Sequence, residues 1–194
     1  MIQGIGLVLI AILAENMVLV KCLGAGEGIA PMRTEEDAWH MGVAQTMVIV
    51  LTSLLCWLAN TFVLEYFGLE HFRLLVYALA VPVAIGLIRK TLHSMFPVLY
   101  RHLNEYLSRS LSNCAVLGVA YIITQRNYSL PQTLLYAAAS GVGVLIVLVI
   151  FTGMQDQAGF DNCPRIFRGM PITLITAGLM ALALMGFYGL NVTA

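Results

Sequence analysis

The sequence has little charge and few cysteines, and each shortage argues against a class of protein. Charged residues make up 10% of its 194 residues, and 10 Lys and Arg balance 10 Asp and Glu, so nothing supports a nucleic-acid-binding surface. The four cysteines form no C-x-x-C pair and no secretory disulfide pattern. The sequence also has no phosphate-binding glycine loop, nucleophile elbow or pair of catalytic carboxylates.

Apolar residues dominate what is present. They make up 60% of the chain, and the mean hydropathy of +0.87 is far above that of a soluble domain. We therefore expect an all-α integral membrane protein. The N-terminus has no basic region and Glu15 interrupts its apolar run, which favours a retained helix over a cleaved signal peptide.

The apolar runs indicate six transmembrane helices. They cover residues 2–23, 39–64, 74–88, 114–124, 130–154 and 172–190. Pro82 in the third run removes a backbone hydrogen bond and predicts a kink. Gly141 and Gly143 in the fifth allow close contact between helices.

The first and fourth segments are broken. Glu15 and Asn16 interrupt the first, and a glycine-rich loop at residues 24–28 follows it, which suggests an unwound end. The apolar run that starts at Cys114 covers only about half of the roughly 30 Å hydrocarbon layer. The preceding residues 103–112 are too polar for lipid, so they must be wrapped in protein or face water.

Residues 97–112 lead into the fourth segment and predict an amphipathic helix. Leucines recur at every fourth residue, and charged residues form a separate stripe. The two stripes are Leu99, Leu103, Leu107 and Leu111 against Arg101, Glu105 and Arg109. Such a helix is expected to enter from the membrane interface.

The two halves of the chain share one layout within a single membrane domain, residues 1–194. Residues 1–90 and 97–194 each begin with a broken segment and continue with two fuller spans, which predicts two inverted three-helix repeats. If the segments alternate, seven basic residues share one side: Arg33, Arg89, Lys90, Arg101, Arg109, Arg165 and Arg168. The positive-inside rule then places both termini outside the cytoplasm.

Cys114 is the first candidate for chemistry. It follows Asn113 at the break in the fourth segment, where the ends of half-helices leave backbone groups unpaired. A thiolate at membrane depth is most useful as a ligand to a soft metal centre, which offsets the cost of the buried charge. The alternative is a buried cysteine that packs as a small hydrophobic residue.

Cys22 is the second candidate, at the end of the first segment. In a straight helix it would lie about 26 Å into the membrane, so the segment must unwind for Cys22 to meet Cys114. Two cysteines do not complete a four-thiolate iron–sulfur site, so a second polypeptide or a second copy must supply the rest. Cys56 is expected in the core, and Cys163 as a reduced thiol in a cytoplasmic loop.

Glu15 and Asn16 are candidates for an ion pathway. Glu15 is the only carboxylate deep in an apolar run, where it would bind a proton or sodium ion or cap a half-helix. The alternative is a hydrated position near the outer interface. The four histidines are scattered near segment ends, which gives a heme or zinc site little support.

Several stretches resemble the RnfA/NqrE membrane proteins. These are residues 15–21 (ENMVLVK), 112–119 (SNCAVLGV), 168–169 and 172–182 (ITLITAGLMAL). Residues 125–129 and 140–143 lean toward NqrE. The similarity runs over nearly the whole chain, with membrane segments at matching places.

The resemblance implies a six-helix, inverted-repeat subunit of the Rnf (ferredoxin:NAD) or Nqr (NADH:quinone) complexes of the prokaryotic cytoplasmic membrane. In that family the subunit pairs with a homologue of opposite topology, RnfE or NqrD. Each partner contributes two cysteines to a [2Fe-2S] cluster that passes single electrons, and electron transfer is coupled to sodium or proton movement. Cys114 falls on one ligand position, and Asn113 is expected to lie next to the cluster without binding iron.

The second family ligand is replaced here. The family pattern Leu-Gly-x-Cys-Pro reads Leu-Gly-Ala-Gly-Glu at residues 23–27, with Gly26 at the cysteine position. Cys22 lies four residues earlier, one helical turn or about 6 Å away if the region is helical. The family's proline-bearing approach to the fourth segment is also replaced, by residues 107–111. A transporter or channel of the same layout and a cluster-free scaffold subunit remain as alternative hypotheses.

Overall fold

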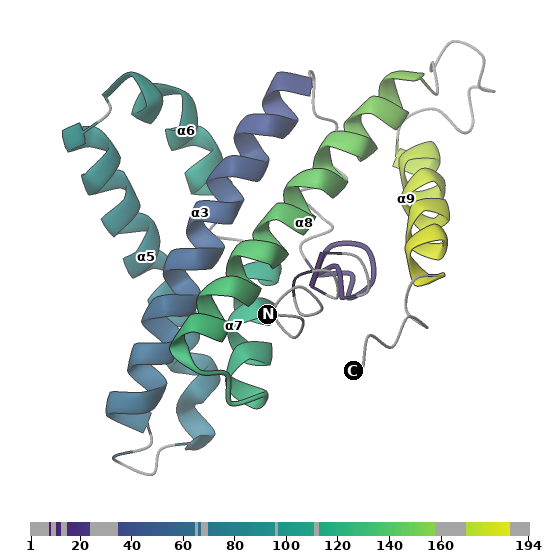
Figure 1. Ribbon diagram of the computed structural model, residues 1–194. Coiled ribbons are helices and arrows are strands. Elements are labelled where there is room, and N and C mark those ends of the chain that lie inside the picture. The colour runs from purple at the N-terminus through teal and green to yellow at the C-terminus, as the bar shows by residue number, and fades with distance from the viewer. Residues whose placement is uncertain are drawn as a thin grey trace.

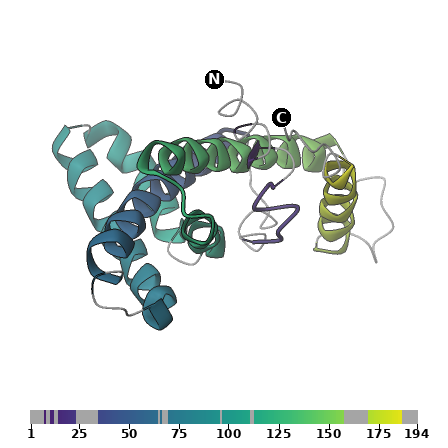
Figure 2. The same ribbon diagram turned by 60° about the horizontal axis from the view of Figure 1, so that its bottom comes forward.

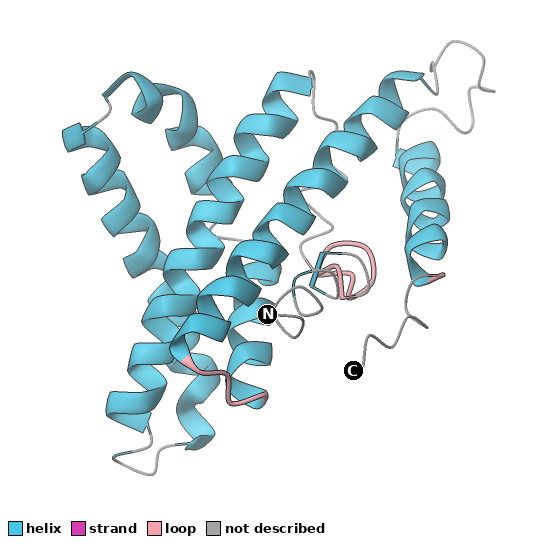
Figure 3. Ribbon diagram, in the orientation of Figure 1, coloured by secondary structure: helices cyan, strands magenta, loops and turns pink. Residues whose placement is uncertain are grey.

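The computed structural model describes residues 8, 11–12, 15–23, 35–64, 66, 70–95, 97–110, 113–157 and 170–186. Within this part the chain is helical and has no strand, with irregular backbone mainly at residues 15–23 and 126–129 (Figure 3). The helices are α3 (Glu35–Ala59), the π-helix η2 (Asn60–Leu64), the 3-10 turn η3 (Glu70–Phe72), α5 (Arg73–Met95), α6 (Pro97–Arg109), α7 (Cys114–Gln125), α8 (Leu130–Gln157) and α9 (Met170–Met185).

Three described helices are long and apolar enough to cross a membrane, which confirms a multi-pass, all-helical protein. They cover Glu36–Leu64, Arg73–Ser94 and Leu130–Gln155, and α6 with α7 forms a fourth candidate if the bent pair is one span. The shorter apolar helix Pro171–Met185 corresponds to the sixth predicted segment. Most of the first segment lies outside the described residues, so the six-helix count and the inverted repeat stay predictions.

Two helix bounds differ from the sequence prediction for one physical reason. α3 begins at Glu35, before the predicted start at Trp39, and α5 continues to Met95, through Pro82 and past the basic pair that follows Ile88. Charged residues end a stretch that lipid tolerates, but they do not end helical hydrogen bonding. Both helices therefore extend beyond their apolar runs.

The amphipathic helix and the break after it are confirmed. Leu103 and Leu107 on α6 are 1% and 0% exposed, and the charged stripe at Arg101, Glu105 and Arg109 is exposed. The axes of Leu103–Arg109 and Cys114–Gln125 are inclined by 66°. The chain therefore bends sharply just before Cys114.

The centre of the fold is the packing of α3 on α8, which run side by side in both views (Figures 1 and 2). Two glycines make this contact close. A Cβ atom at Gly141 would lie 2.6 Å from Thr46 Cγ2, and one at Gly42 would lie 2.8 Å from Leu145 Cγ. Small residues let helix backbones approach in lipid, where the hydrophobic effect does not press helices together.

Replacing Gly141 by alanine is expected to destabilise the fold by about 1–3 kcal/mol, because the added methyl group overlaps Thr46. Gly86 on α5 is the matched control, since a Cβ there meets nothing within 4 Å. Alanine at Gly86 should stabilise its helix by about 0.5–1 kcal/mol. Unfolding of the two variants in detergent, followed by circular dichroism, measures the difference. Equal shifts for both would contradict the close contact.

Candidate functional site

Asn16 organises the break in the first segment. Its side chain is 1% exposed, and its Oδ1 accepts hydrogen bonds from the backbone N–H groups of Val18 (3.1 Å) and Leu19 (3.4 Å). Its Nδ2 donates to the carbonyl oxygens of Ile12 and Gly143, both at 3.1 Å. One buried amide thus satisfies backbone groups on both sides of the break and ties the segment to α8.

Gly143 is what allows this segment to lie directly on α8. A Cβ atom there would lie 3.2 Å from the Cα of Ile12 and 3.3 Å from Nδ2 of Asn16. The glycine was expected from the sequence to serve close helix contact, and the structure uses it for contact with the broken segment. Figure 2 shows this segment beneath α8, between α7 and α9.

Cys22 lies in the irregular stretch that follows Asn16. Its φ of 53° is in the left-handed region, which is uncommon for a residue with a side chain. Its thiol is exposed and donates to the Leu19 carbonyl oxygen at 3.6 Å. Cys22 also lines an apolar cavity of about 210 Å³ with residues of α8 and α9, among them Phe151 and Ala177.

The residue after Cys22 connects the stretch to α7. The Leu23 side chain lies against Gly118, at a distance that leaves no room for a Cβ atom, and Met17 Sδ lies 3.9 Å from the same position. Gly118 is one helical turn after Cys114. The structure therefore brings the two broken segments into contact, as expected, while the Cys22 side chain lines the cavity on the side of α8 and α9.

Cys114 is the first residue of α7, and its thiol is exposed. Asn113 caps the helix, because its Oδ1 accepts a hydrogen bond from the Ala115 N–H at 2.9 Å. The predicted neighbour of the metal ligand therefore has a definite structural role. The positive end of a helix favours negative charge, so a thiolate at this position gains stabilisation from α7.

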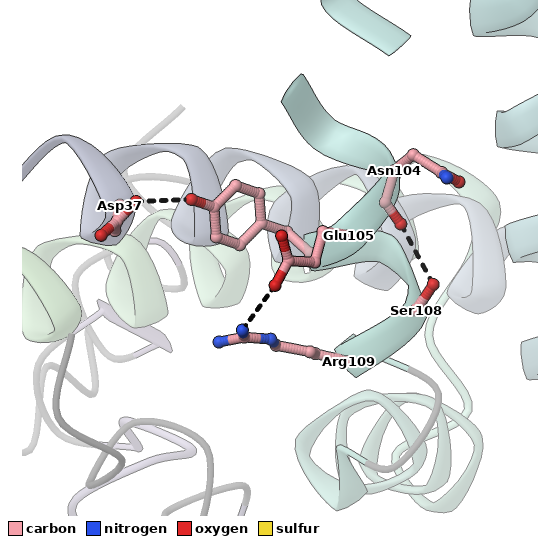
Figure 4. A network of polar contacts seen from close by, with 6 residues as sticks. Asp37, Asn104, Glu105, Ser108 and Arg109 are labelled. Carbon is pink, nitrogen blue, oxygen red and sulfur yellow. Dashed lines mark hydrogen bonds and ion pairs between the residues drawn. The ribbon is translucent and has the colours of Figure 1, made fainter. Parts of the chain in front are cut away.

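Contacts between α3 and α6 fix the position of the break before Cys114. The Tyr106 hydroxyl donates to Asp37 Oδ1 at 2.6 Å, and Figure 4 shows this contact above the polar side chains of α6. The Ser110 hydroxyl donates to Gln45 Oε1 at 2.8 Å. Polar groups of residues 103–112 thus find partners in protein, as the sequence required.

Glu15 is held by two residues that sequence reasoning did not single out. Its carboxylate forms an ion pair with Arg126 and accepts a hydrogen bond from the Tyr136 hydroxyl at 2.9 Å. Burial opposes charge on Arg126, but hydrogen bonds to Glu15 and Tyr128 raise its pKa above the usual value, so the guanidinium stays charged. The side chain of Glu15 is 12% exposed.

This ion pair joins the broken segment to the turn between α7 and α8. A double-mutant cycle of Glu15→Gln and Arg126→Gln is expected to give a coupling energy of about 1–2 kcal/mol, between the values of exposed and buried pairs. The pair Glu105–Arg109 is the control, because its side chains are 72% and 53% exposed. Its coupling should be about 0.3–0.5 kcal/mol. Urea unfolding in detergent measures both, and equal couplings would contradict an anchoring role for Glu15.

The described residues fit one part of a shared metal site and not a complete one. No group of three or more His, Cys, Asp and Glu residues in the described part of the chain can hold a metal ion. Two exposed thiols, those of Cys22 and Cys114, lie on broken segments that touch each other. Thiolates are the usual ligands of iron–sulfur clusters. A cluster held here would therefore need ligands from a second chain.

The other sequence candidates have simpler positions. Cys56 is 1% exposed, which confirms it as a core residue. His40 stacks on the ring of Tyr106, and His93 meets Tyr100 edge to face, with ring centroids 6.2 and 5.3 Å apart. Cys163 and Gly26 lie outside the described residues.

Comparison with known proteins gives consistent results over the length of the chain. A family model described as Rnf-Nqr subunit, membrane protein, matches residues 5–191. The chain is 37% identical over 179 residues to the RnfA protein of the ion-translocating oxidoreductase complex of Vibrio atlanticus, and the match covers 92% of this chain and 93% of that protein. It is 38% identical over 180 residues to the corresponding protein of Syntrophotalea carbinolica, with 93% of each chain covered.

Proposed function

The chain belongs to the Rnf-Nqr family of membrane proteins, and from this membership we propose that it is a membrane subunit of an ion-translocating oxidoreductase complex. Relatives that share more than nine-tenths of its length are named as subunits of such complexes. The match covers nearly all of their length, so the proposal concerns the whole protein. The chain is expected to act only with its partners.

The observation that carries the chemical part of the proposal is the exposed Cys114 thiol at the positive end of α7. Cys114 would hold a [2Fe-2S] cluster, with Cys22 as the second ligand from this chain and two ligands from a homologous RnfE/NqrD-like subunit of opposite topology. Such a cluster supplies one-electron transfer across the membrane interior. Exposure of both thiols supports sharing with a neighbour.

The residues around the two thiols hold the broken segments in place. Asn113 caps α7 and keeps Cys114 at its first position, next to unpaired backbone N–H groups. Asn16 and Glu15 fix the first segment to α8 and to Arg126. The role of Glu15 and Asn16 in an ion pathway stays a prediction, since their contacts already give them a structural task.

The proposed location is a prokaryotic cytoplasmic membrane, with both termini on the outer side. The basic residues Arg89, Lys90 and Arg101 lie where α5 ends and α6 begins, and Arg73 and Arg126 lie at the opposite ends of α5 and α7. The excess of positive charge supports a cytoplasmic side at the junction of α5 and α6. Labelling of the variant Arg101→Cys at this position from outside intact cells would contradict this orientation.

The test is to purify the intact complex through a tag on this chain and to reconstitute it in vesicles. We expect bound iron, a visible absorbance band that dithionite bleaches, and ion uptake that depends on an electron donor. The isolated chain in vesicles should transport nothing. Ion transport by the isolated chain without a redox partner would instead favour a transporter or channel, and an active complex without iron near this chain would favour a scaffold.

A further inference from the structure

A groove on the surface of the described part of the molecule lies between α3, α5 and α8. Its volume is about 750 Å³, within the range of small-molecule sites. The residues that line it are Val43, Thr46, Met47, Val50, Leu51, Leu54, Leu87, Ile88, Thr91, Leu92, Val142 and Leu145. The lining is almost entirely apolar, so its occupant must be apolar where it lies in the groove.

The two threonines do not change this conclusion. The Thr46 hydroxyl donates to the Gly42 carbonyl oxygen at 2.8 Å, and the Thr91 hydroxyl donates to the Leu87 carbonyl oxygen at 2.9 Å. Each hydroxyl is thus bonded within its own helix. The groove offers little hydrogen bonding to a ligand and recognises it by shape and apolar contact.

The length of the groove favours a lipid over a partner helix. Along α3 it extends from Val43 to Leu54, which is about 16 Å at 1.5 Å per residue. That is about half of the roughly 30 Å hydrocarbon layer, the depth of one leaflet. A transmembrane helix of another subunit would contact the full depth, whereas acyl chains end at the midplane. Figure 1 shows α5 diverging from α3 toward the end where α6 begins.

Positive charge stands beside the groove. Arg89 and Lys90 lie in the same turn of α5 as the lining residues Ile88 and Thr91. Lys90 is exposed, and Arg89 has a buried Nε without a hydrogen-bond partner among the described residues, while its Nη2 donates to Ser108 at 2.6 Å. These groups are suited to bind a phosphate.

An aromatic residue marks the same level on α3. Trp39, 55% exposed, lies one helical turn before Val43. Tryptophan is enriched at the interface between hydrocarbon and water. The acidic groups closest to this region along α3 and α6 are engaged elsewhere, because Asp37 binds Tyr106 and Glu105 binds Arg109. The charge beside the groove is therefore positive.

We propose that this groove binds one anionic phospholipid, with its acyl chains along α3 and its phosphate against Lys90 and Arg89. The site is distinct from the two thiols and does not depend on the redox function. It joins α3, α5 and α8 on the side expected to face the cytoplasm, where anionic headgroups attract basic side chains.

The test uses the full-length chain, purified in detergent and studied by native mass spectrometry with equal amounts of phosphatidylglycerol and phosphatidylcholine. We expect about a 5-fold preference for phosphatidylglycerol, which is the factor that one basic group supplies near an anionic lipid. Lys90→Glu should abolish the preference and Lys90→Arg should keep it. Arg101→Glu, an exposed charge change on α6, is the matched control and should leave the preference unchanged.

A second variant tests the groove itself. Met47 lines the groove and is 36% exposed, so tryptophan at this position fills the groove without entering the core. Met47→Trp should lower the binding of both lipids at least about 5-fold, with an unchanged unfolding temperature. Equal binding of the two lipids by the wild type, or an unchanged preference in Lys90→Glu, would overturn the proposal. So would a cross-link from Met47→Cys to another protein of the complex in place of lipid.

Discussion

Replacing Cys114 by alanine is expected to remove most of the iron from the purified complex and to slow electron transfer at least about 100-fold. Changes to residues that merely surround metal ligands already cost about 10- to 100-fold, so loss of a ligand should cost at least as much. The change should leave the fold intact, because the thiol is exposed and Asn113 still caps α7. Iron analysis and donor-to-acceptor kinetics of the same preparation measure the effect.

Two further cysteine variants make this result specific. Cys56→Ala removes a buried thiol on α3 and should leave iron and electron transfer unchanged. Cys22→Ala separates the second ligand from the first: if Cys22 binds the cluster, its loss should match that of Cys114. Full iron and full activity in Cys114→Ala would contradict the proposed ligand.

Replacing Asn16 by leucine is expected to destabilise the chain by about 3 kcal/mol or more and to lower iron content as a consequence. The change keeps the approximate size of the side chain but leaves the N–H groups of Val18 and Leu19 and the Gly143 carbonyl without their partner. Each buried group left unsatisfied costs about 1–3 kcal/mol. Unfolding in detergent by urea, at a fixed detergent concentration, gives the free energy.

Asn104→Leu is the matched control for Asn16→Leu. Asn104 lies on α6, and its Oδ1 is buried without a hydrogen-bond partner among the described residues, so leucine there should change the free energy of unfolding by less than about 1 kcal/mol. If the two variants unfolded alike, the break in the first segment would not depend on its buried amide. A loss of iron in Asn16→Leu without loss of stability would point to a more direct role at the metal.

The helices of the fold were predictable because lipid imposes one simple rule on sequence. A segment that crosses the bilayer must be apolar and must satisfy its own backbone, so the runs at α3, α5 and α8 are visible without a structure. The stripe of leucines on α6 and the break before Cys114 were visible for the same reason. The extension of α5 to Met95 was not, because a charged pair changes the solvent a helix tolerates and not its hydrogen bonding.

The contacts that fix the site depend on pairings that no local pattern encodes. Glu15 and Arg126 are 111 residues apart, and Asn16 and Gly143 are 127 residues apart. A charged residue in an apolar run signals that a partner is needed, but sequence alone does not identify the partner. The signal at Arg126 was its place in the short turn where α7 gives way to α8.

Cys22 shows where the sequence argument was incomplete. Its spacing from the break suggested a thiol that approaches Cys114 once the segment unwinds. The segment does unwind, and Leu23 does contact α7, but Cys22 lines the cavity formed with α8 and α9. Side chains of consecutive residues in irregular backbone point in different directions, so contact by one residue does not carry over to the next. The role of Cys22 as a ligand is therefore less direct than that of Cys114.

The most direct test of the central claim is a density map of the intact complex around Cys114 and its neighbouring subunit. The proposal predicts iron within bonding distance of the Cys114 sulfur, about 2.3 Å, with further thiolate ligands from the neighbour. A Cys114 side chain that points into lipid or apolar packing, with no metal within reach of its sulfur, would contradict it.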